Sequence, residues 1–454
     1  MKTPTLELSN FVSETTYLQA PQAIQDQLIA CLLDYFRVAS IGQRMPWSRW
    51  SEAFCAKTSH PGSSKVLFSE QHLDVISCTF LNTIYSGSVD ADDVHVGAML
   101  HPGCVIISSA LAIAQDRGKT GLETLDAILA GYESMIRLGL AIQPGHFKRG
   151  FQSTSTCGVL GAAVTAAKLM FEGPQCVLKV AQTLGIAASF CGGLTQFFHS
   201  GSTVKRLHAA QAASSGVKAA LLVEAGFMGP SDILEGEDGF FRAYSDTLDT
   251  DKLLVGLGTR FETSGVAIKP HASSARVLSA IEAALTLVQN HAFNFEDIES
   301  IDLGVPKVIF GRLTSTTPQD VQAAQMSAPF CVALALYLKK NTTQSINMDD
   351  FENHIEHPQV RALCAKVHCH LDEEVESTST QESVSAKLSI TFKNQLQVSE
   401  FIKAPKGSAS RPYELSDHLI KLSQELETRF SKEKAEHITN RLVNFKNLKT
   451  LTID

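Results

Sequence analysis

The chain has 454 residues, of which 44% are hydrophobic and 19% are charged, so it can form two or three domains around a large buried core. Its formal net charge of -8 argues against nucleic acid or an anionic membrane as the main partner. A chain of this charge can still bind an anion where cationic side chains and helix N-termini gather.

The first fifteen residues lack a basic region followed by an apolar core, so we expect no secretory signal. The least charged stretch, residues 180–204, is interrupted by Gln182, Gln196 and the pair Gly192-Gly193, which favours a buried core helix over a membrane span. The ten cysteines contain no CxxC pair, which fits a reducing cytoplasm and argues against a zinc or iron–sulfur site. We therefore predict a cytoplasmic protein that has no metal and no membrane partner.

Residues 20–260 carry mostly helical signals. Ile24, Leu28 and Tyr35 recur at helical spacing. Thr120 and Glu123 have the spacing of a capping box, and Gly118 is placed to end the helix before it. Runs of small residues, at 158–163 and 209–213, would let helix axes approach closely. These patterns predict a large all-helical domain over residues 1–262.

The pattern changes after Gly265. Extended segments are expected at 301–309, 367–371 and 386–392, and the last continues through a turn into a hairpin. Helices are expected at 274–287 and 323–338. Residues 265–403 are therefore predicted to form a smaller α+β domain. A Pro/Gly/Ser linker, 404–412, follows it, and a helical segment, 415–445, would return to the first domain, which thus also includes residues 405–454.

The most polar cluster beside apolar helices contains Asp90, Asp92, Asp93, His95 and His101. These carboxylates and imidazoles could bind a divalent cation, or they could orient one histidine as a base. A solvated loop with helix caps is the alternative on spacing alone. Because no second ligand motif accompanies the cluster, a metal site is the least favoured of the three.

Three basic segments could meet a carboxylate: 146–152, 201–208 and 269–271. Each places cations or an imidazole near a turn and a helix, where backbone N–H groups can also bind an anion. A solvated surface turn is the alternative for each segment alone. Gly118-Lys119-Thr120 lacks the first glycine of a P-loop, and His368-Cys369-His370 fits a strand whose histidines share one face.

Together these segments resemble the MmgE/PrpD family, which includes 2-methylcitrate dehydratase, cis-aconitate decarboxylase and iminodisuccinate epimerase. The resemblance covers nearly the whole chain. It implies a large helical domain plus a smaller α+β lid, an active site between them, no cofactor, and a homodimer. The resemblance is clearest at residues 90–103, 131–133, 150–163, 201–213 and 226–236.

Matched residue by residue, the resemblance implies that Asp90, His101 and Lys205 are catalytic. It places these further residues near the substrate carboxylates: Arg149, Gln152, Ser202, His208, Lys269, His271 and Ser274. The chain also departs from the family pattern at four positions. Gln152 stands where lyase members usually have His, Val94 where they have Thr, Phe330 where some have Tyr, and Ser274 where some have His or Cys.

The resulting hypothesis is a cofactor-independent lyase of a small polycarboxylic acid, similar to 2-methylcitrate dehydratase. His101 would act as base or acid, oriented by Asp90, and Lys205, Arg149 and Lys269 would stabilise charge on the carboxylate. The alternatives are an isomerase or epimerase of an iminodisuccinate-like substrate, a cis-aconitate-type decarboxylase, and a catalytically silent protein that binds polycarboxylates.

Overall fold

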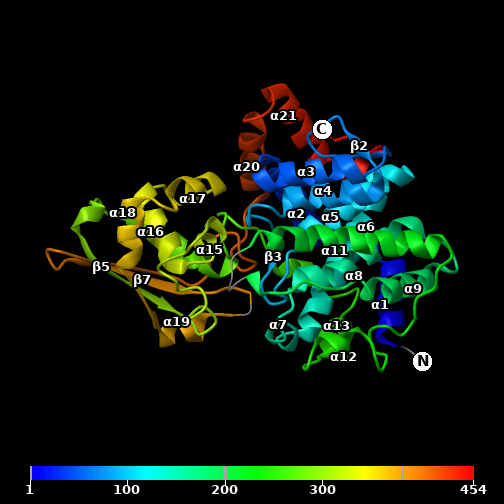
Figure 1. The fold of residues 1–454 in the computed structure, drawn as a ribbon, viewed down its shortest axis with the longest axis horizontal. Helices are drawn as coiled ribbons and strands as arrows, with labels where there is room; N and C mark the ends of the chain where they lie inside the picture. Colours follow the sequence, from blue (N-terminus) through cyan, green and yellow to red (C-terminus); the bar gives the residue numbers. More distant parts are fainter. Residues whose placement is uncertain (1–2, 198–201, 381, 454) are drawn as a thin grey trace.

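A computed structural model of the chain describes residues 3–197, 202–380 and 382–453. Over these residues the fold is mainly helical, as predicted, with three small sheets. The buried hydrophobic residues form two clusters. Figure 1 shows a helical body on one side and a body that contains strands β5 and β7 on the other. Among the described helices, none combines the length and the apolar character needed to cross a membrane.

The helical body draws its helices from both ends of the chain. Helices α20 (Leu415–Glu427) and α21 (Lys432–Val443) both pack against α2 (Gln22–Gln43), and Ser431 caps α21 and so divides the C-terminal segment into two helices. Its longer helices are α1 (Pro4–Glu14), α2 (Gln22–Gln43), α3 (Pro46–Thr58), α4 (Val75–Ser86), α5 (Pro102–Arg117), α6 (Gly121–Ile142), α8 (Ser153–Met170), α9 (Cys176–Ala188), α11 (Val204–Glu224), α20 (Leu415–Glu427) and α21 (Lys432–Val443).

Helix α8 lies among α5, α6, α9 and α11. A Cβ atom at Gly161 would lie 2.8 Å from the Met135 Cβ atom, and one at Gly216 would lie 2.4 Å from the Val159 carbonyl oxygen. The small residues thus permit close helix approach, as predicted. The predicted capping box of Thr120 and Glu123 is present at the start of α6.

The prediction of one buried helix over residues 180–204 is wrong. Helix α9 ends at Ala188, and α11 begins at Val204. Gly193 has a φ of 105°, which a helix cannot contain and which side chains disfavour. Its carbonyl instead accepts a hydrogen bond of 3.1 Å from the backbone N–H of Gln152. The segment after α9 therefore lies beside the start of α8. Residues 198–201 lie outside the described part of the chain.

The second body contains a four-stranded sheet in the order β6-β5-β7-β8. Strands β5 and β6 are parallel, and the predicted hairpin is the antiparallel pair β7–β8. The expected helix at 323–338 is two helices, because Ser327 caps the second. The elements are α14 (Leu278–Asn290), β5 (Ile298–Val305), α15 (Val321–Gln325), α16 (Ala328–Leu338), α17 (Met348–His354), α18 (Pro358–Ala365), β6 (Val367–Leu371), α19 (Glu373–Thr378), β7 (Ala386–Phe392) and β8 (Gln397–Ile402).

A two-residue ladder joins the two parts of the chain near their junction. Strand β3 (Val94–His95) pairs antiparallel with β4 (Val266–Ala267). The second hydrophobic cluster also takes in Val38 and Val89 from the N-terminal part. The short ladder places the segment after β4, which contains Lys269, beside the loop that begins at Asp90.

Candidate active site

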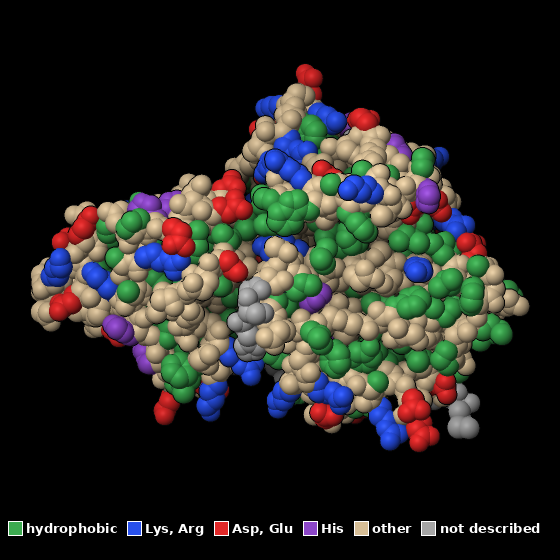
Figure 2. Space-filling model, in the orientation of Figure 1, with side chains coloured by type: hydrophobic (Ala, Val, Ile, Leu, Met, Phe, Trp, Pro, Cys, Tyr) green, Lys and Arg blue, Asp and Glu red, His purple; other side chains and the backbone are tan. Residues whose placement is uncertain are grey.

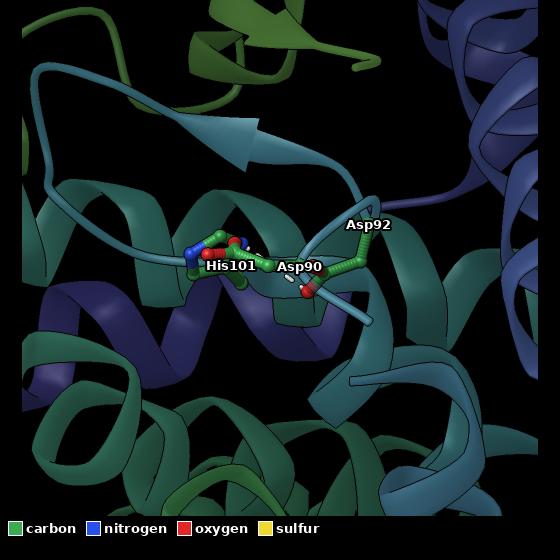
Figure 3. A group of neighbouring side chains, drawn as sticks. All are labelled: Asp90, Asp92 and His101. Carbon is green, nitrogen blue, oxygen red and sulfur yellow. Dashed lines mark ion pairs between the residues drawn. The ribbon is translucent and has the colours of Figure 1, made fainter. Parts of the chain in front are cut away.

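The loop between α4 and α5 carries the acidic and histidine residues singled out in the sequence. Figure 3 shows Asp90, Asp92 and His101 on this loop, with their side chains close together. Asp90 has a φ of 56°, a left-handed conformation that few residues other than glycine adopt. Such a conformation persists where surrounding contacts enforce it.

His101 is the N-cap residue of α5. Its backbone N–H donates to the Thr154 Oγ1 atom at 3.0 Å. Its Nδ1 atom lies 3.0 Å from the carbonyl oxygen of Asp93 and 3.2 Å from the Asp92 Oδ2 atom. Both partners are acceptors, so Nδ1 carries the ring proton of the neutral imidazole. Among the described residues Nε2 has no hydrogen-bond partner, which leaves it available to accept a proton in the cavity described below.

The carboxylate in contact with His101 is therefore that of Asp92, and the predicted orientation by Asp90 needs this correction. Asp90 is engaged elsewhere. Its Oδ2 atom lies 2.8 Å from Lys205 Nζ, and its Oδ1 atom lies 2.7 Å from Lys269 Nζ. Burial favours the protonated acid, but these two ammonium groups outweigh burial and hold the Asp90 pKa well below its usual range. Asp90 is thus a carboxylate shared between two lysines.

The environments of the next two aspartates, Asp92 and Asp93, shift their pKa values in opposite directions. Burial raises the pKa of Asp92, but His101 and Lys269 together lower it to about 2. Burial raises the pKa of Asp93 to about 7, and the charge of Asp92 adds to this effect while the Tyr132 hydroxyl opposes it. Asp93 accepts hydrogen bonds from Tyr132 Oη at 2.7 Å and from the Gly103 N–H at 2.8 Å. Asp93 therefore fixes the first turn of α5 rather than facing a ligand.

The ligand atoms of Asp90, Asp92 and His101 all lie within 4.8 Å of one another, so this group is a candidate for a divalent cation. Two carboxylates and an imidazole suit such an ion chemically. However, Asp90 already contacts two ammonium groups, and Lys269 Nζ also lies 3.6 Å from Asp92 Oδ1. A dication in the same place would be repelled by both lysines, so the donor set fits an ion-pair network better than a metal.

A cavity of about 800 Å³ lies between the two bodies. The helical body contributes Asp90, His101 and Lys205 to its wall, and the second body contributes Arg276 and Arg312. Among the described residues, the wall contains four Lys and Arg residues, Lys148 being the fourth, and two acidic residues, one of which is Asp90. In a chain of net charge -8 this excess of cations suits a small anion.

The predicted substrate-binding residues do not all line this cavity. Gln152 and Ser274 do so. Lys269 is fully buried beneath Asp90, while His208 and His271 are buried away from the lining. Ser202 is exposed at the start of α11, where its Oγ atom accepts a hydrogen bond from the Val204 N–H.

Arg149 also lies outside the lining, and its guanidinium pairs with Asp246 at 2.7 Å. Sequence reasoning missed Arg276 and Arg312. Each is a single arginine in a loop or short turn, and no spacing signal marks such a residue. Only their position near the Lys269 segment and the 301–309 strand marks them in the sequence.

A second cavity of about 780 Å³ is lined by α3, α4 and α11. Its wall is mainly apolar and includes Trp50 and Phe54, whose exposed fractions are 61% and 57%. Figure 2 shows hydrophobic side chains gathered on this face of the helical body. No histidine or carboxylate lines the cavity among the described residues, so it lacks the groups needed for acid–base chemistry.

The fold and the first cavity define a class: a mainly helical protein with an acid–base group and a cation-rich pocket for a small anion where its two bodies meet. Residues 6–252 match the MmgE/PrpD N-terminal domain, and residues 271–445 match the MmgE/PrpD C-terminal domain. The chain therefore belongs to the MmgE/PrpD family.

Three similar proteins share a substantial part of the chain. A cis-aconitate decarboxylase-like protein of Aspergillus oryzae is 25% identical over 427 residues, covering 89% of this chain and 86% of that protein. The cis-aconitate decarboxylase of Aspergillus terreus is 24% identical over 425 residues, covering 89% and 85%. The cis-aconitate decarboxylase of Homo sapiens is 28% identical over 328 residues, covering 69% and 65%.

Proposed function

We propose that the chain is a cofactor-independent lyase that acts on a small polycarboxylic acid. The observation that carries the proposal is the His101 imidazole at the cavity wall, with Nδ1 held by Asp92 and the Asp93 carbonyl and with Nε2 unpaired among the described residues. Lys205 lines the same cavity beside it. The names of the similar proteins support a lyase, since each is called a cis-aconitate decarboxylase or a protein like one.

The chemistry requires one proton carrier and one fixed positive charge. In decarboxylation the bond from carbon to a carboxylate breaks, its electron pair moves into the framework conjugated with another carboxylate, and carbon dioxide leaves. A proton must then reach carbon, and protonated His101 could supply it. The Lys205 ammonium would stabilise the negative charge that builds up on the neighbouring carboxylate.

Dehydration would use the same two groups. His101 would remove the proton next to a carboxylate whose charge Lys205 stabilises, and the imidazolium so formed would give that proton to the hydroxyl group, which leaves as water. Decarboxylation is the reaction to test first, because the similar proteins carry that name. Epimerisation is the remaining alternative. Gln152 lines the cavity where lyase members usually have His, and an amide cannot transfer a proton, so an epimerase would need Lys205 to serve the face of the carbon opposite His101.

The test is turnover followed by NMR in heavy water, with cis-aconitate, 2-methylcitrate and iminodisuccinate as separate substrates. A decarboxylase releases carbon dioxide, a dehydratase releases water, and an epimerase exchanges the α-proton without losing either. We expect His101→Gln to lower the catalytic rate roughly 100-fold or more with normal melting. His368→Gln is the matched control, because His368 is exposed on β6. Absence of turnover with every polycarboxylate would instead indicate a silent binding protein.

We also propose that the second body acts as a lid over the cavity and that the chain forms a homodimer, as the family resemblance implies. The exposed apolar residues of the second cavity, such as Trp50 and Phe54, support a protein interface on that face. Light scattering on the purified protein tests the homodimer directly, and a mass of one chain at micromolar concentration would contradict it.

A further inference from the structure

Arg276 and Arg312 come from separate segments of the second body and line the same cavity. Arg276 lies in the short 3-10 turn Ala275–Val277 before α14, and Arg312 lies in the loop after β5. Their backbone N–H groups donate to Ser274 Oγ and to the Ile309 carbonyl, respectively. Within the described residues, neither guanidinium has a hydrogen bond or an ion pair.

This lack of partners distinguishes the two residues from most arginines in the described part of the chain, although the exposed Arg49 shares it. The Arg37 guanidinium contacts Asp34 at 2.6 Å, and that of Arg411 contacts Glu282 at 2.6 Å. Arg206, which is buried at the junction, donates to the Ser88 carbonyl at 3.1 Å and to Gln322 Oε1 at 2.8 Å. The cavity therefore holds two guanidinium groups that the protein has left without the acceptors it supplies elsewhere.

The two cations also destabilise each other. Burial lowers the pKa of Arg276, and the positive charge of Arg312 lowers it further, which places the two groups in each other's field. The guanidinium carbon of Arg312 lies 5.8 Å from the centroid of the Phe147 ring, which belongs to the helical body. An anion between the two groups would remove this repulsion. A guanidinium presents paired N–H donors whose spacing matches the two oxygens of a carboxylate.

Among the other cations of the site, Lys205 and Lys269 both contact the carboxylate of Asp90, whereas Lys148 lines the cavity from the helical body. We infer that Arg276 and Arg312 form a clamp for a substrate carboxylate other than the one next to His101 and Lys205. The clamp selects substrates with carboxylates far enough apart to touch both bodies, and it deepens the proposed function by defining the substrate class. Its residues position the substrate and take no part in proton transfer.

The test uses tricarballylate, a tricarboxylate without a leaving group, and isothermal titration calorimetry. We expect Arg276→Met and Arg312→Met each to raise its Kd at least tenfold. Arg276→Lys should fall between wild type and Arg276→Met, because lysine keeps the charge and loses the paired donors. Arg361→Met is the matched control, since Arg361 of the same body pairs with Glu356 at 3.1 Å and should leave the Kd unchanged.

Thermal melting shows whether each variant is folded. If Arg276→Met does not fold, Arg312→Met alone tests the clamp, because Arg312 is exposed and its replacement should not disturb the fold. Both methionine variants binding within twofold of wild type would overturn the clamp, as would a wild type that does not bind tricarballylate. Failure of the proposed function is separate. It would appear as a wild type that binds tricarballylate, loses that affinity in the variants, and turns over no polycarboxylate.

Discussion

Lys269 holds Asp90 by two bonds from one fully buried ammonium group. Its Nζ atom lies 2.7 Å from the Asp90 Oδ1 atom and 2.6 Å from the Asp90 carbonyl oxygen. The second bond fixes the backbone of a residue whose φ is 56°, and the first neutralises its carboxylate. Because Lys269 follows β4, which pairs with β3, the contact also ties the start of the second body to the active-site loop.

Lys269→Met should therefore destabilise the protein by roughly 3–5 kcal/mol, because removing one partner leaves a buried charge incompletely paired. Urea unfolding measures this loss. Adding Asp90→Asn to the variant should recover part of the loss, since the unpaired charge is then removed. Lys387→Met, which breaks an exposed ion pair with Glu374, should be as stable to urea as the wild type. A Lys269→Met protein as stable as the Lys387→Met control would contradict the role of this contact.

Lys205 and Arg149 should differ in ligand binding although both were predicted near the substrate. Lys205→Met should weaken binding of tricarballylate by roughly 1.5–3 kcal/mol, the scale of a hydrogen bond to a charged group. Arg149→Met should leave the affinity unchanged, because Arg149 pairs with Asp246 and does not line the cavity. Calorimetry measures the tricarballylate affinity of both variants. Equal losses of affinity would show that Arg149 also reaches the ligand.

Exhaustive chelation should leave activity unchanged. The two lysines bound to Asp90 oppose a dication at Asp90, Asp92 and His101. The measurement is the turnover rate before and after dialysis against EDTA, with and without added divalent ions. Activity that disappears with EDTA and returns with one particular ion would establish a metal site at this cluster.

His146 should make stability depend on pH. Its ring is buried, its Nε2 atom lies 2.8 Å from Thr156 Oγ1, and burial lowers its pKa from 6.5 to about 4. Because the unfolded chain takes up the proton first, this contribution is complete above pH 6.5 and is lost as pH falls through about 4. Between pH 7.5 and pH 5 the wild type should lose about 2 kcal/mol more stability than His146→Gln, at 1.36 kcal/mol per pH unit. Urea unfolding at both pH values measures the two losses of stability. An equal loss in the wild type and in His146→Gln would refute this expectation.

The amino-acid sequence was sufficient for features that depend on neighbours along the chain. Helix periodicity at Ile24 and Leu28, the capping box at Thr120, and the alternation of residues 386–392 all predict elements that the structure contains. Local geometry decides each of these features, because the interacting groups lie within four residues of one another. The family resemblance depends on the same ordered local segments, and it implies catalytic roles for Asp90, His101 and Lys205 without reference to the fold.

Tertiary structure alone decided how those residues are paired. The sequence could not assign Asp92 rather than Asp90 to His101, since both precede it in one loop of irregular backbone. It could not show that Lys269 would be buried under Asp90, because 179 residues separate them and the β3–β4 ladder brings them together. Arg276 and Arg312 carry no pattern at all in the sequence. Their role depends on the cavity between the two bodies, where two guanidinium groups without acceptors among the described residues favour an anion.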